Sequence, residues 1–398
     1  MAKFAHLVMV TSLNNNKFYD MKEEGDTFVV TYGRIGSSSV TATYPMSDWN
    51  KKYREKIRKG YVDMTDMVKT AVPQDEEKDG YKPIEDAVIA EVFRYLRRCS
   101  RQVIRENYMV SSDAVTMEMV NAAQDKLNAL AHSSDFRVFN EQLLELFTIL
   151  PRQMTNVRSY LASSNSDFGE IVQREQDLLD VMRGQVVTAA PIRKSNQKMA
   201  DCTLLEAIGI EVEPVTDEEK ANIIRHLGRC KTYYKNAWRI RNKKTSEAFY
   251  DYLGTHSECK KKLLWHGSKN ENWFSILESG LKLNPNATIT GKMFGKGIYF
   301  APSAAKSLGY TSIQGSYWAG GSSPRAFMSV MEVACGKPFD IYDNPYGWSG
   351  ITGNNLDSYC KGANYVFAHK DKGMLKNDEL VVYDEAQVNI KYLVELHQ

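Results

Sequence analysis

The spacing of hydrophobic residues changes twice along the chain, so one type of secondary structure cannot account for the whole fold. Residues 4–44 contain short β-branched and aromatic runs, such as FAHLVMV and TFVVTYGRIG, separated by Asn runs or Gly, which predict strands. Residues 84–184 place apolar residues three to four positions apart, which predicts helices. After residue 200 short helical and strand patterns are mixed. We therefore expect an α+β multidomain protein.

The first domain is expected over residues 1–70, as a small β-rich unit with one helix. Its helix is predicted over residues 47–59, SDWNKKYREKIRK, because the strand pattern gives way to a helical one after a Ser/Asp start. Residues 69–83 contain Pro, Gly and several acidic residues, which is typical of a linker.

The second domain is expected over residues 83–186, as an all-α bundle whose last helix ends near Gly184. A second linker is predicted over residues 185–202. Residues 200–398 contain helices mixed with strands such as GKGIYF, AFMSVMEVA and VNIKYLVEL, which predicts an α+β domain with antiparallel sheets.

Composition excludes several classes of protein. The formal net charge is only +2, so any electrostatic argument depends on local clusters. The six cysteines have no CxxC spacing and no histidines at zinc-ligand spacing, so we expect reduced thiols and no metal. No run of about 18 apolar residues is present, so no membrane partner is expected. The expected compartment is intracellular: the nucleus in a eukaryote, or the cytosol or nucleoid in a bacterium.

Three polar residues stand at strand edges among apolar neighbours: His266 in LLWHGS, Tyr299 in GKGIYFA and Glu379 in NDELVVYD. Each alone is consistent with a purely structural role, because most polar groups in a fold are simply hydrogen-bonded. Glycines surround two of them, and Gly267 would let a ligand approach the backbone. Together they indicate a binding or catalytic site. The nearby GKMFGKG lacks the spacing of a phosphate-binding loop.

The motifs LLWHGS, MFGKGIYFA and DELVVYDEAQVNIKYL resemble the catalytic domain of poly(ADP-ribose) polymerases. Upstream, LELFTILPRQM and DLLDVMRG resemble the helical regulatory domain of that family. FVVTYGRIGS resembles its WGR domain, with Tyr32 where Trp is usual. The order of the three blocks is that of the family, so the resemblance covers nearly the whole chain. It implies a WGR domain, a regulatory bundle and an ADP-ribosyltransferase domain.

The resemblance implies a reaction and a set of partners. NAD+ is the expected substrate, and cleavage of its nicotinamide–ribose bond passes through an oxocarbenium-like transition state, as in glycoside hydrolysis. ADP-ribose would be transferred to protein acceptors, including the protein itself, and nicotinamide would be released. The chain would be activated by DNA strand breaks and would be a monomer when not bound to DNA.

The resemblance also assigns roles to individual residues. Its catalytic residues fall on Glu379, His266 and Tyr299. Its NAD+-binding residues fall on His266, Gly267, Ser268, Asn272, Lys282, Tyr299, Ser307 and Tyr310, with Lys282 where Arg is usual. Its acceptor pocket falls on Met293, Lys306 and Glu379, a set that favours chain elongation. The predicted DNA contacts are Tyr32, Gly33, Arg34, Lys51 and Lys52, and the predicted regulatory residue is Asp180.

Other interpretations stay open at this point. The basic helix over 50–59 is also consistent with a solvated surface, and residues 84–184 with a plain structural bundle. The chain would alternatively be a mono-ADP-ribosyltransferase, or a DNA-end-binding scaffold with an inactive transferase domain.

Overall fold

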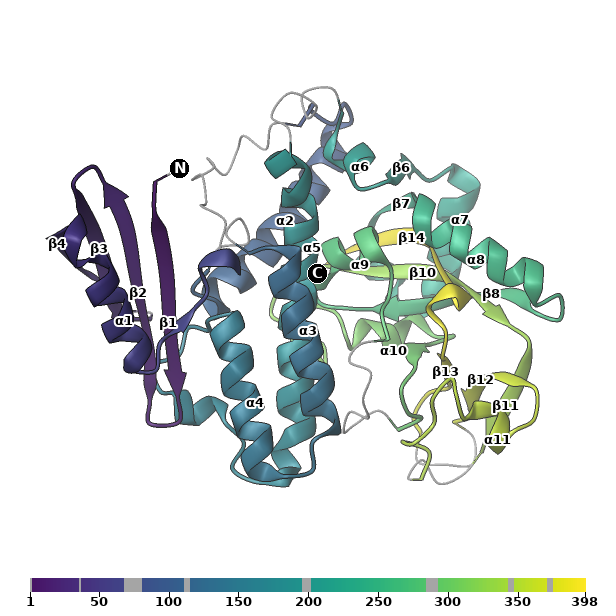
Figure 1. Cartoon of the computed structure of the whole chain (residues 1–398). Coiled ribbons are helices and arrows are strands. Elements are labelled where there is room, and N and C mark those ends of the chain that lie inside the picture. Colours follow the sequence, from purple (N-terminus) through teal and green to yellow (C-terminus); the bar gives the residue numbers. More distant parts are fainter. Residues whose placement is uncertain are drawn as a thin grey trace. The chain divides into compact units, whose positions relative to one another are not determined.

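The computed structural model describes residues 2–35, 37–67, 81–110, 115–194, 202–283, 293–342, 347–370 and 375–398. The chain divides into two compact units. The first unit comprises Met1–Glu77 and Arg101–Ala189, and the second comprises Lys78–Ser100 and Ala190–Gln398. Figure 1 labels their elements. The predicted linker over 69–83 lies mostly outside the described residues, and the three predicted domain boundaries remain a prediction.

The first unit begins with an antiparallel sheet in the order β4-β3-β2-β1-β5. Its elements are β1 Phe4–Thr11, β2 Asn15–Glu24, β3 Thr27–Arg34, β4 Val40–Pro45, α1 Trp49–Arg58 and β5 Val62–Asp63. The predicted strands and the predicted helix are therefore confirmed. In β1, Leu7 packs with Trp49, whereas Val8 and Val10 pack against the helices, because successive strand residues point to opposite faces.

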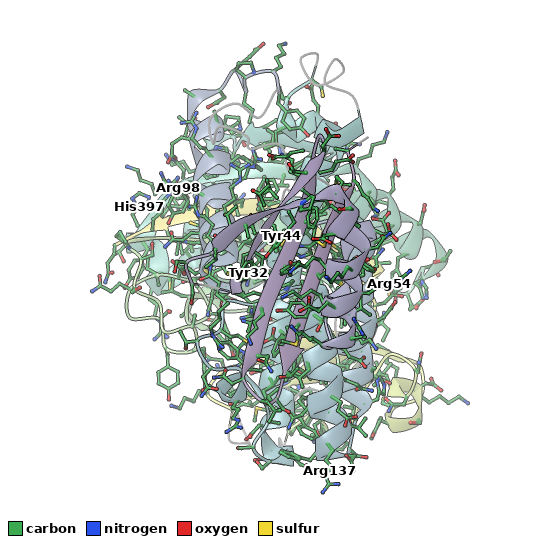
Figure 2. All side chains as sticks on the ribbon, turned by 60° about the vertical axis from the view of Figure 1, so that its left-hand side comes forward. Tyr32, Tyr44, Arg54, Arg98, Arg137 and His397 are labelled. Carbon is green, nitrogen blue, oxygen red and sulfur yellow. The ribbon has the colours of Figure 1, made fainter. Side chains whose placement is uncertain are left out.

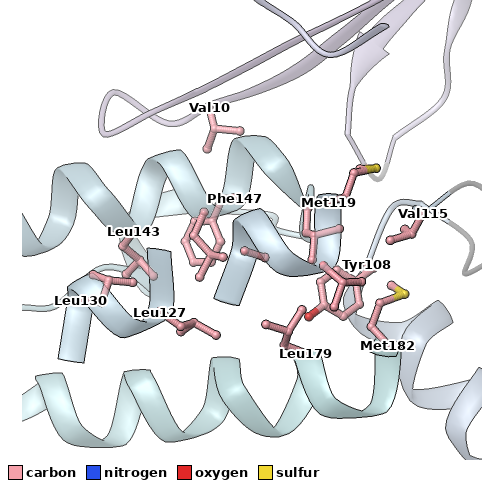
Figure 3. Close-up of a cluster of buried hydrophobic side chains, with 14 of the residues drawn as sticks. Val10, Tyr108, Val115, Met119, Leu127, Leu130, Leu143, Phe147, Leu179 and Met182 are labelled. Carbon is pink, nitrogen blue, oxygen red and sulfur yellow. The ribbon is translucent and has the colours of Figure 1, made fainter. Parts of the chain in front are cut away.

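Four long helices follow: α2 Ala87–Asn107, α3 Met117–His132, α4 Phe136–Ile149 and α5 Phe168–Lys194. Helix α3 is capped by the Thr116 side chain, and α4 by that of Asp135. The end of α2, at Ile104, and the apolar faces of α3, α4 and α5 form one core that also receives Val10 of β1 (Figure 3). The first half of α2 instead packs in a core of the second unit. Helix α4 ends just before Pro151, as predicted.

One helix boundary was predicted wrongly. Helix α5 was expected to end near Gly184, but it continues to Lys194. A glycine inside a helix costs only about 1 kcal/mol relative to alanine, so the neighbouring turns carry the helix through it. The predicted linker over 185–202 is therefore helical through residue 194, and residues 195–201 lie outside the described residues.

A buried ion pair joins segments that are distant in sequence in the first unit. The guanidinium of Arg152 lies against the carboxylate of Glu175, and the two side chains are 2% and 3% exposed. Arg152 also donates to the backbone oxygen of Asn107 at 2.9 Å, and its own carbonyl accepts from Asn16 at 3.1 Å. The pair therefore connects α2, the segment after α4, α5 and the N-terminal sheet.

The described residues of the second unit form two sheets. The larger has the order β6-β7-β14-β10-β8, and the smaller has the order β11-β12-β13-β9. Every pair is antiparallel except β11–β12, which is parallel. The strands are β6 Ile210–Pro214, β7 Tyr234–Asn242, β8 Lys260–Gly267, β9 Ile298–Phe300, β10 Arg325–Cys335, β11 Lys337–Ile341, β12 Ala363–Ala368, β13 Glu379–Val382 and β14 Val388–His397. The α+β fold class is thus confirmed.

Short helices surround these sheets: α6 Leu204–Ala207, α7 Asp217–Leu227, α8 Lys243–Thr255, α9 Trp273–Ser279, α10 Ala304–Leu308 and α11 Leu356–Tyr359. A backbone bridge joins the two sheets, because Trp265 and Ala301 exchange hydrogen bonds of 2.9 and 3.0 Å. The ends of β8 and β9 therefore lie side by side. Among the described residues, no helix is both long and apolar enough to cross a membrane.

Substituting Arg152 with Ala should lower the free energy of unfolding by about 3 kcal/mol or more, since one partner of a buried pair is left without its charge complement. Urea denaturation followed by circular dichroism measures the change. The control is Lys126→Ala, which removes the exposed Lys126–Glu145 pair and should cost at most about 1 kcal/mol. Equal costs for the two variants would contradict the role of the buried pair.

Candidate functional site

A pocket lies where the end of β8 meets β9, α10 and the start of β13. The space between its walls, including the open solvent at its mouth, is about 390 Å³. Its lining consists of His266, Gly267, Tyr299, Phe300, Ala301, Lys306, Ser307, Tyr310 and Glu379. Seven of these nine residues are among the predicted site residues, and Phe300 and Ala301 are the additional two. Segments more than a hundred positions apart in sequence therefore contribute to one cavity.

His266 ends β8 with its ring packed edge-on against Trp273 and Phe300. Its Nδ1 lies 3.1 Å from the carbonyl oxygen of Tyr299. Burial lowers the pKa of His266 to about 4, so the ring is neutral at physiological pH. Because the carbonyl only accepts, Nδ1 carries the proton and Nε2 carries the lone pair. The ring can therefore accept a hydrogen bond at Nε2.

Gly267 is required by the close approach of α10. A Cβ atom at this position would lie 1.9 Å from the Ser307 carbonyl oxygen, far inside contact distance. The absence of a side chain therefore lets the Ser307 backbone sit directly against the end of β8. Ser307 itself is only 3% exposed and lines the pocket.

Tyr299 supports the turn that precedes β9. Its hydroxyl donates to the carbonyl of Gly295 and accepts from the backbone N–H of Phe294, both at 3.0 Å. Burial raises its pKa above the usual range of a phenol, so the hydroxyl stays protonated. Met293 packs partly buried against the same cluster as Tyr299. The Tyr299 ring thus forms a fixed wall of the pocket.

Glu379, at the start of β13, forms an ion pair with Lys306 of α10. Both side chains are nearly buried, at 12% and 11% exposure. Each offsets part of the other's cost of carrying a charge away from water. A carboxylate and an ammonium are therefore both presented to the pocket, within contact of each other.

Tyr310 follows α10 and forms the outer wall of the pocket, with 40% of its surface exposed. Burial of the rest raises the pKa of its phenol to about 12, so the ring is neutral. Its face is available for stacking with a planar group inside the pocket.

Three predicted NAD+-binding residues do not line this pocket. Asn272 donates to the hydroxyl of Ser268 at 3.0 Å, so these two side chains hold each other just beyond the end of β8. Lys282 forms an ion pair of 2.8 Å with Glu385. The contacts of Ser268, Asn272 and Lys282 with the adenosine ribose stay a prediction.

The predicted DNA-contacting residues lie in the first unit. Lys56 Nζ lies over the ring of Tyr19 at 4.0 Å and over that of Tyr32 at 5.7 Å, and Lys52 Nζ lies 4.4 Å from the Tyr44 ring. Tyr32 and Tyr44 lie on the sheet and Arg54 lies on α1 (Figure 2). Lys51 is exposed on the same helix. Aromatic and cationic groups are thus interleaved on this surface.

Arg34 is engaged within its own unit. It donates to the carbonyl and side-chain oxygens of Asn14 at 2.8 and 2.9 Å, and to the Thr155 carbonyl at 2.7 Å. Gly33 beside it approaches the backbone of Ser38 closely, since a Cβ would lie 3.2 Å from that carbonyl oxygen. The end of β3 is therefore tied to the segment that follows α4.

The predicted regulatory residue, Asp180, lies on α5 of the first unit. It accepts a hydrogen bond of 2.9 Å from Gln176, which is fully buried and also exchanges hydrogen bonds with Gln124. Its regulatory role stays a prediction. Within the described parts of the chain, no group of three or more His, Cys, Asp or Glu side chains could hold a metal ion.

Sequence reasoning missed two features of the pocket. Phe300 and Ala301 follow Tyr299 directly, so their place in the lining could have been read from GIYFA. The ion pair between Lys306 and Glu379 left no local signal, because 72 residues separate its two partners.

Replacing Gly267 with Ala should lower the free energy of unfolding by about 1–3 kcal/mol, because the added methyl overlaps the Ser307 carbonyl. Gly254→Ala is the matched control, since a Cβ there meets nothing within 4 Å and lies within α8. That control should be neutral or stabilising by up to about 1 kcal/mol. Thermal unfolding measures both changes, and a neutral Gly267→Ala would contradict the close approach.

His266 should not titrate in the folded protein between about pH 8 and pH 5.5, whereas an ordinary histidine has a pKa near 6.5. The folded pKa lies below the unfolded value, so the unfolded state binds more protons between them. Protonation of His266 in the unfolded state therefore lowers the free energy of unfolding as the pH falls from about 6.5 towards 4. Histidine NMR titration, with His266→Gln for assignment, measures the pKa, and a midpoint near 6.5 would contradict it.

Comparison with known proteins matches both ends of the chain. Residues 225–398 match the poly(ADP-ribose) polymerase catalytic domain, and residues 4–67 match the WGR domain. Protein 101L of Invertebrate iridescent virus 6 is 33% identical over 190 residues, which cover 47% of this chain and 79% of that protein. The poly(ADP-ribose) polymerase-like protein 100L of the same virus is 30% identical over 186 residues, covering 45% of this chain and 96% of that protein.

Poly(ADP-ribose) polymerase 1 of Danio rerio is 25% identical over 416 aligned positions, which cover 96% of this chain but only 40% of that protein. The chain thus spans less than half of this larger relative and most of the two viral proteins. The matched catalytic segment contains every residue that lines the pocket. The chain belongs to the poly(ADP-ribose) polymerase family.

Proposed function

We propose that the protein is a DNA-break-activated poly(ADP-ribose) polymerase that transfers ADP-ribose from NAD+ to proteins, including itself, and releases nicotinamide. The observation that carries this proposal is the single pocket that holds His266, Tyr299 and Glu379 together. The match of this region to the family's catalytic domain supports ADP-ribosyl transfer with NAD+ as substrate.

The nicotinamide end of NAD+ would enter between Tyr310 and Tyr299. The backbone of Gly267 would hold the carboxamide, because no side chain shields its N–H and C=O, and Ser307 would add a hydroxyl to the same group. The neutral Tyr310 ring would stack on the nicotinamide. Stacking of two rings adds about 0.5–1.5 kcal/mol beyond burial alone.

Glu379 would act where positive charge develops. Departure of nicotinamide leaves an oxocarbenium-like ribose, and a fixed carboxylate beside it stabilises that charge without reorganising at the moment of reaction. Its ion pair with Lys306 supports a pre-aligned orientation. The same carboxylate would hold the ribose 2′-OH and polarise the hydroxyl of the acceptor, with Met293 and Lys306 at the acceptor side.

His266 would bind the adenosine ribose. Its neutral ring presents a lone pair at Nε2, which suits the donated O–H of a sugar. The mutually bonded Ser268 and Asn272, with Lys282 further along the chain, would extend this ribose and adenosine site.

The N-terminal unit would recognise the DNA break. Tyr32, Tyr44 and the lysines of α1 form a surface of aromatic and cationic groups, which suits stacking on exposed bases together with contacts to phosphate. The WGR match supports this assignment. Arg34 would transmit DNA binding rather than contact DNA alone, because its guanidinium already holds the carbonyl of Thr155.

The helical part would restrain activity until DNA binds, with Asp180 as the regulatory residue. A substitution tests this better than a deletion, because Val92, Phe93 and Leu96 of α2 themselves belong to the second unit, where they are buried in the same core as Trp273. Removing the whole helical block would expose that core.

Asp180→Ala should instead raise nicotinamide release in the absence of DNA, and an unchanged DNA-free rate would contradict the regulatory role.

Glu379→Gln should abolish chain elongation and slow transfer by about a hundredfold or more, the scale for losing one pre-aligned electrostatic group. Incubation with NAD+ and nicked duplex DNA, followed by gel electrophoresis of the protein and assay of free nicotinamide, measures both effects. The wild-type protein should give a smear. Long chains made by the variant would contradict the role of Glu379. A single-step shift by the wild type would make the protein a mono-ADP-ribosyltransferase, and no released nicotinamide would make it an inactive scaffold.

Arg34→Ala should leave DNA-free nicotinamide release unchanged and reduce the DNA-stimulated rate by about tenfold or more, because hydrogen bonds to a charged group contribute about 1.5–3 kcal/mol each. The exposed Arg137 of α4, labelled in Figure 2, provides the control: Arg137→Ala should leave stimulation intact. Raising the salt concentration should weaken DNA binding steeply. Full stimulation of the Arg34 variant would refute the transmitting role.

A further inference from the structure

The segment between α10 and β10 forms a closed, hydrogen-bonded loop beside the pocket. Its two ends are held together, because Gln314 donates to the Ser323 carbonyl at 2.8 Å and Ser323 donates to the Ser312 carbonyl at 2.9 Å. Inside it, Gly321 donates to the Ser316 hydroxyl at 2.8 Å. A short loop whose ends meet and whose interior is hydrogen-bonded has a defined conformation.

Three glycines are needed for this loop to form. Gly315 and Gly320 adopt φ values of +80° and +59°, in the left-handed region. A Cβ on Gly321 would lie 2.3 Å from the Ile313 carbonyl oxygen, so only glycine allows the loop to close here. The three glycines therefore allow the backbone to adopt this loop conformation.

The tip of the loop returns to the residue before Tyr310. Trp318 and Ala319 both donate their backbone N–H groups to the carbonyl of Gly309, at 2.9 and 3.0 Å. The fit is close, since a Cβ on Gly309 would lie 2.9 Å from the Trp318 ring. Trp318 is therefore held against the end of α10.

The indole of Trp318 stacks on the phenol of Tyr310. The ring centroids lie 6.0 Å apart and the planes differ by 15°, an offset stack. Tyr310 lines the pocket, so one aromatic ring in the pocket wall is supported by another outside it. Trp318 nevertheless remains 61% exposed, although burying an indole is favourable. Its position is thus not explained by core packing.

We propose that Trp318 is a positioning residue for substrate binding, which fixes the ring of Tyr310 so that the nicotinamide of NAD+ can stack on it. This inference rests on the proposed function, because it assumes that nicotinamide binds beside Tyr310. The loop over residues 312–323 supplies the support, and the three rings would form a continuous stack from the loop through the wall to the substrate.

The neighbouring Tyr317 offers a matched control. It meets Trp318 edge-on at 4.6 Å and is 78% exposed, so it is an aromatic residue of the same loop tip. No ring contact joins it to Tyr310 among the described aromatic pairs. Replacing Tyr317 therefore removes an exposed ring of the same loop but keeps the stack of Trp318 on Tyr310.

The experiment measures the dissociation constant of nicotinamide, and the KM and kcat for NAD+, for the full-length protein with nicked DNA. Trp318→Ala should raise the dissociation constant and KM by about threefold to tenfold, the effect of one aromatic stack. It should change kcat by less than about twofold, because the support acts on binding. Trp318→Phe should restore most of the affinity, and Tyr317→Ala should stay within about twofold of the wild type.

Two further measurements separate positioning from a merely structural role. In a Tyr310→Ala background, Trp318→Ala should cause no additional loss of nicotinamide affinity, because Trp318 acts through Tyr310. Nicotinamide should also change the tryptophan emission of the wild type, and Trp318→Phe should remove that change. The fluorescence measurement uses only the wild type and Trp318→Phe, so it tests the proposal even if thermal unfolding shows that Trp318→Ala is unstable.

The outcomes separate the inference from the proposed function. Unchanged affinity in Trp318→Ala, or an additional loss in the Tyr310→Ala background, overturns the inference while NAD+ turnover by the wild type upholds the function. A wild type that neither binds nicotinamide nor releases it from NAD+ overturns both.

Discussion

The contact between Gly267 and the carbonyl of Ser307 is the constraint on which the pocket depends. It brings the last residue of β8 against α10, and α10 in turn carries Lys306 and precedes Tyr310. With any side chain at residue 267, α10 would have to move away, and the wall of the pocket would move with it. The bridge between Trp265 and Ala301 then places β9 and Tyr299 on the adjoining side.

Much of this site was predictable because its residues belong to compact motifs. LLWHGS and GKGIYFA each combine a strand end with a glycine, and both motifs contribute to the pocket lining. What the sequence could not provide is the pairing of distant side chains. The ion pair of Lys306 with Glu379 has no local pattern, because it depends on how two distant segments meet. The stack of Trp318 on Tyr310 depends on how the loop between them closes, which the spacing of the two residues does not show.

The elements of the fold were predictable to a similar extent. Hydrophobic spacing indicated the strands of the N-terminal sheet and the helices that follow, because period 2 and period 3.6 are distinct signals. It failed at Gly184, where the burial of Val181, Met182 and Val186 beside it outweighs a weak local preference. It also could not indicate that α2 divides between two compact units at Ser100, since both halves of that helix have the same amphipathic spacing.

The pairing of Lys306 with Glu379 has a consequence for how this chain can diverge. Because both side chains are almost shielded from water, a neutral residue at either position alone would strand the opposite charge in a poorly hydrated place. A lineage that replaces Glu379 must therefore also replace Lys306, because the fold is less stable with only one of the two charges. Descendants with another chemistry in this cavity should carry paired replacements at these two positions.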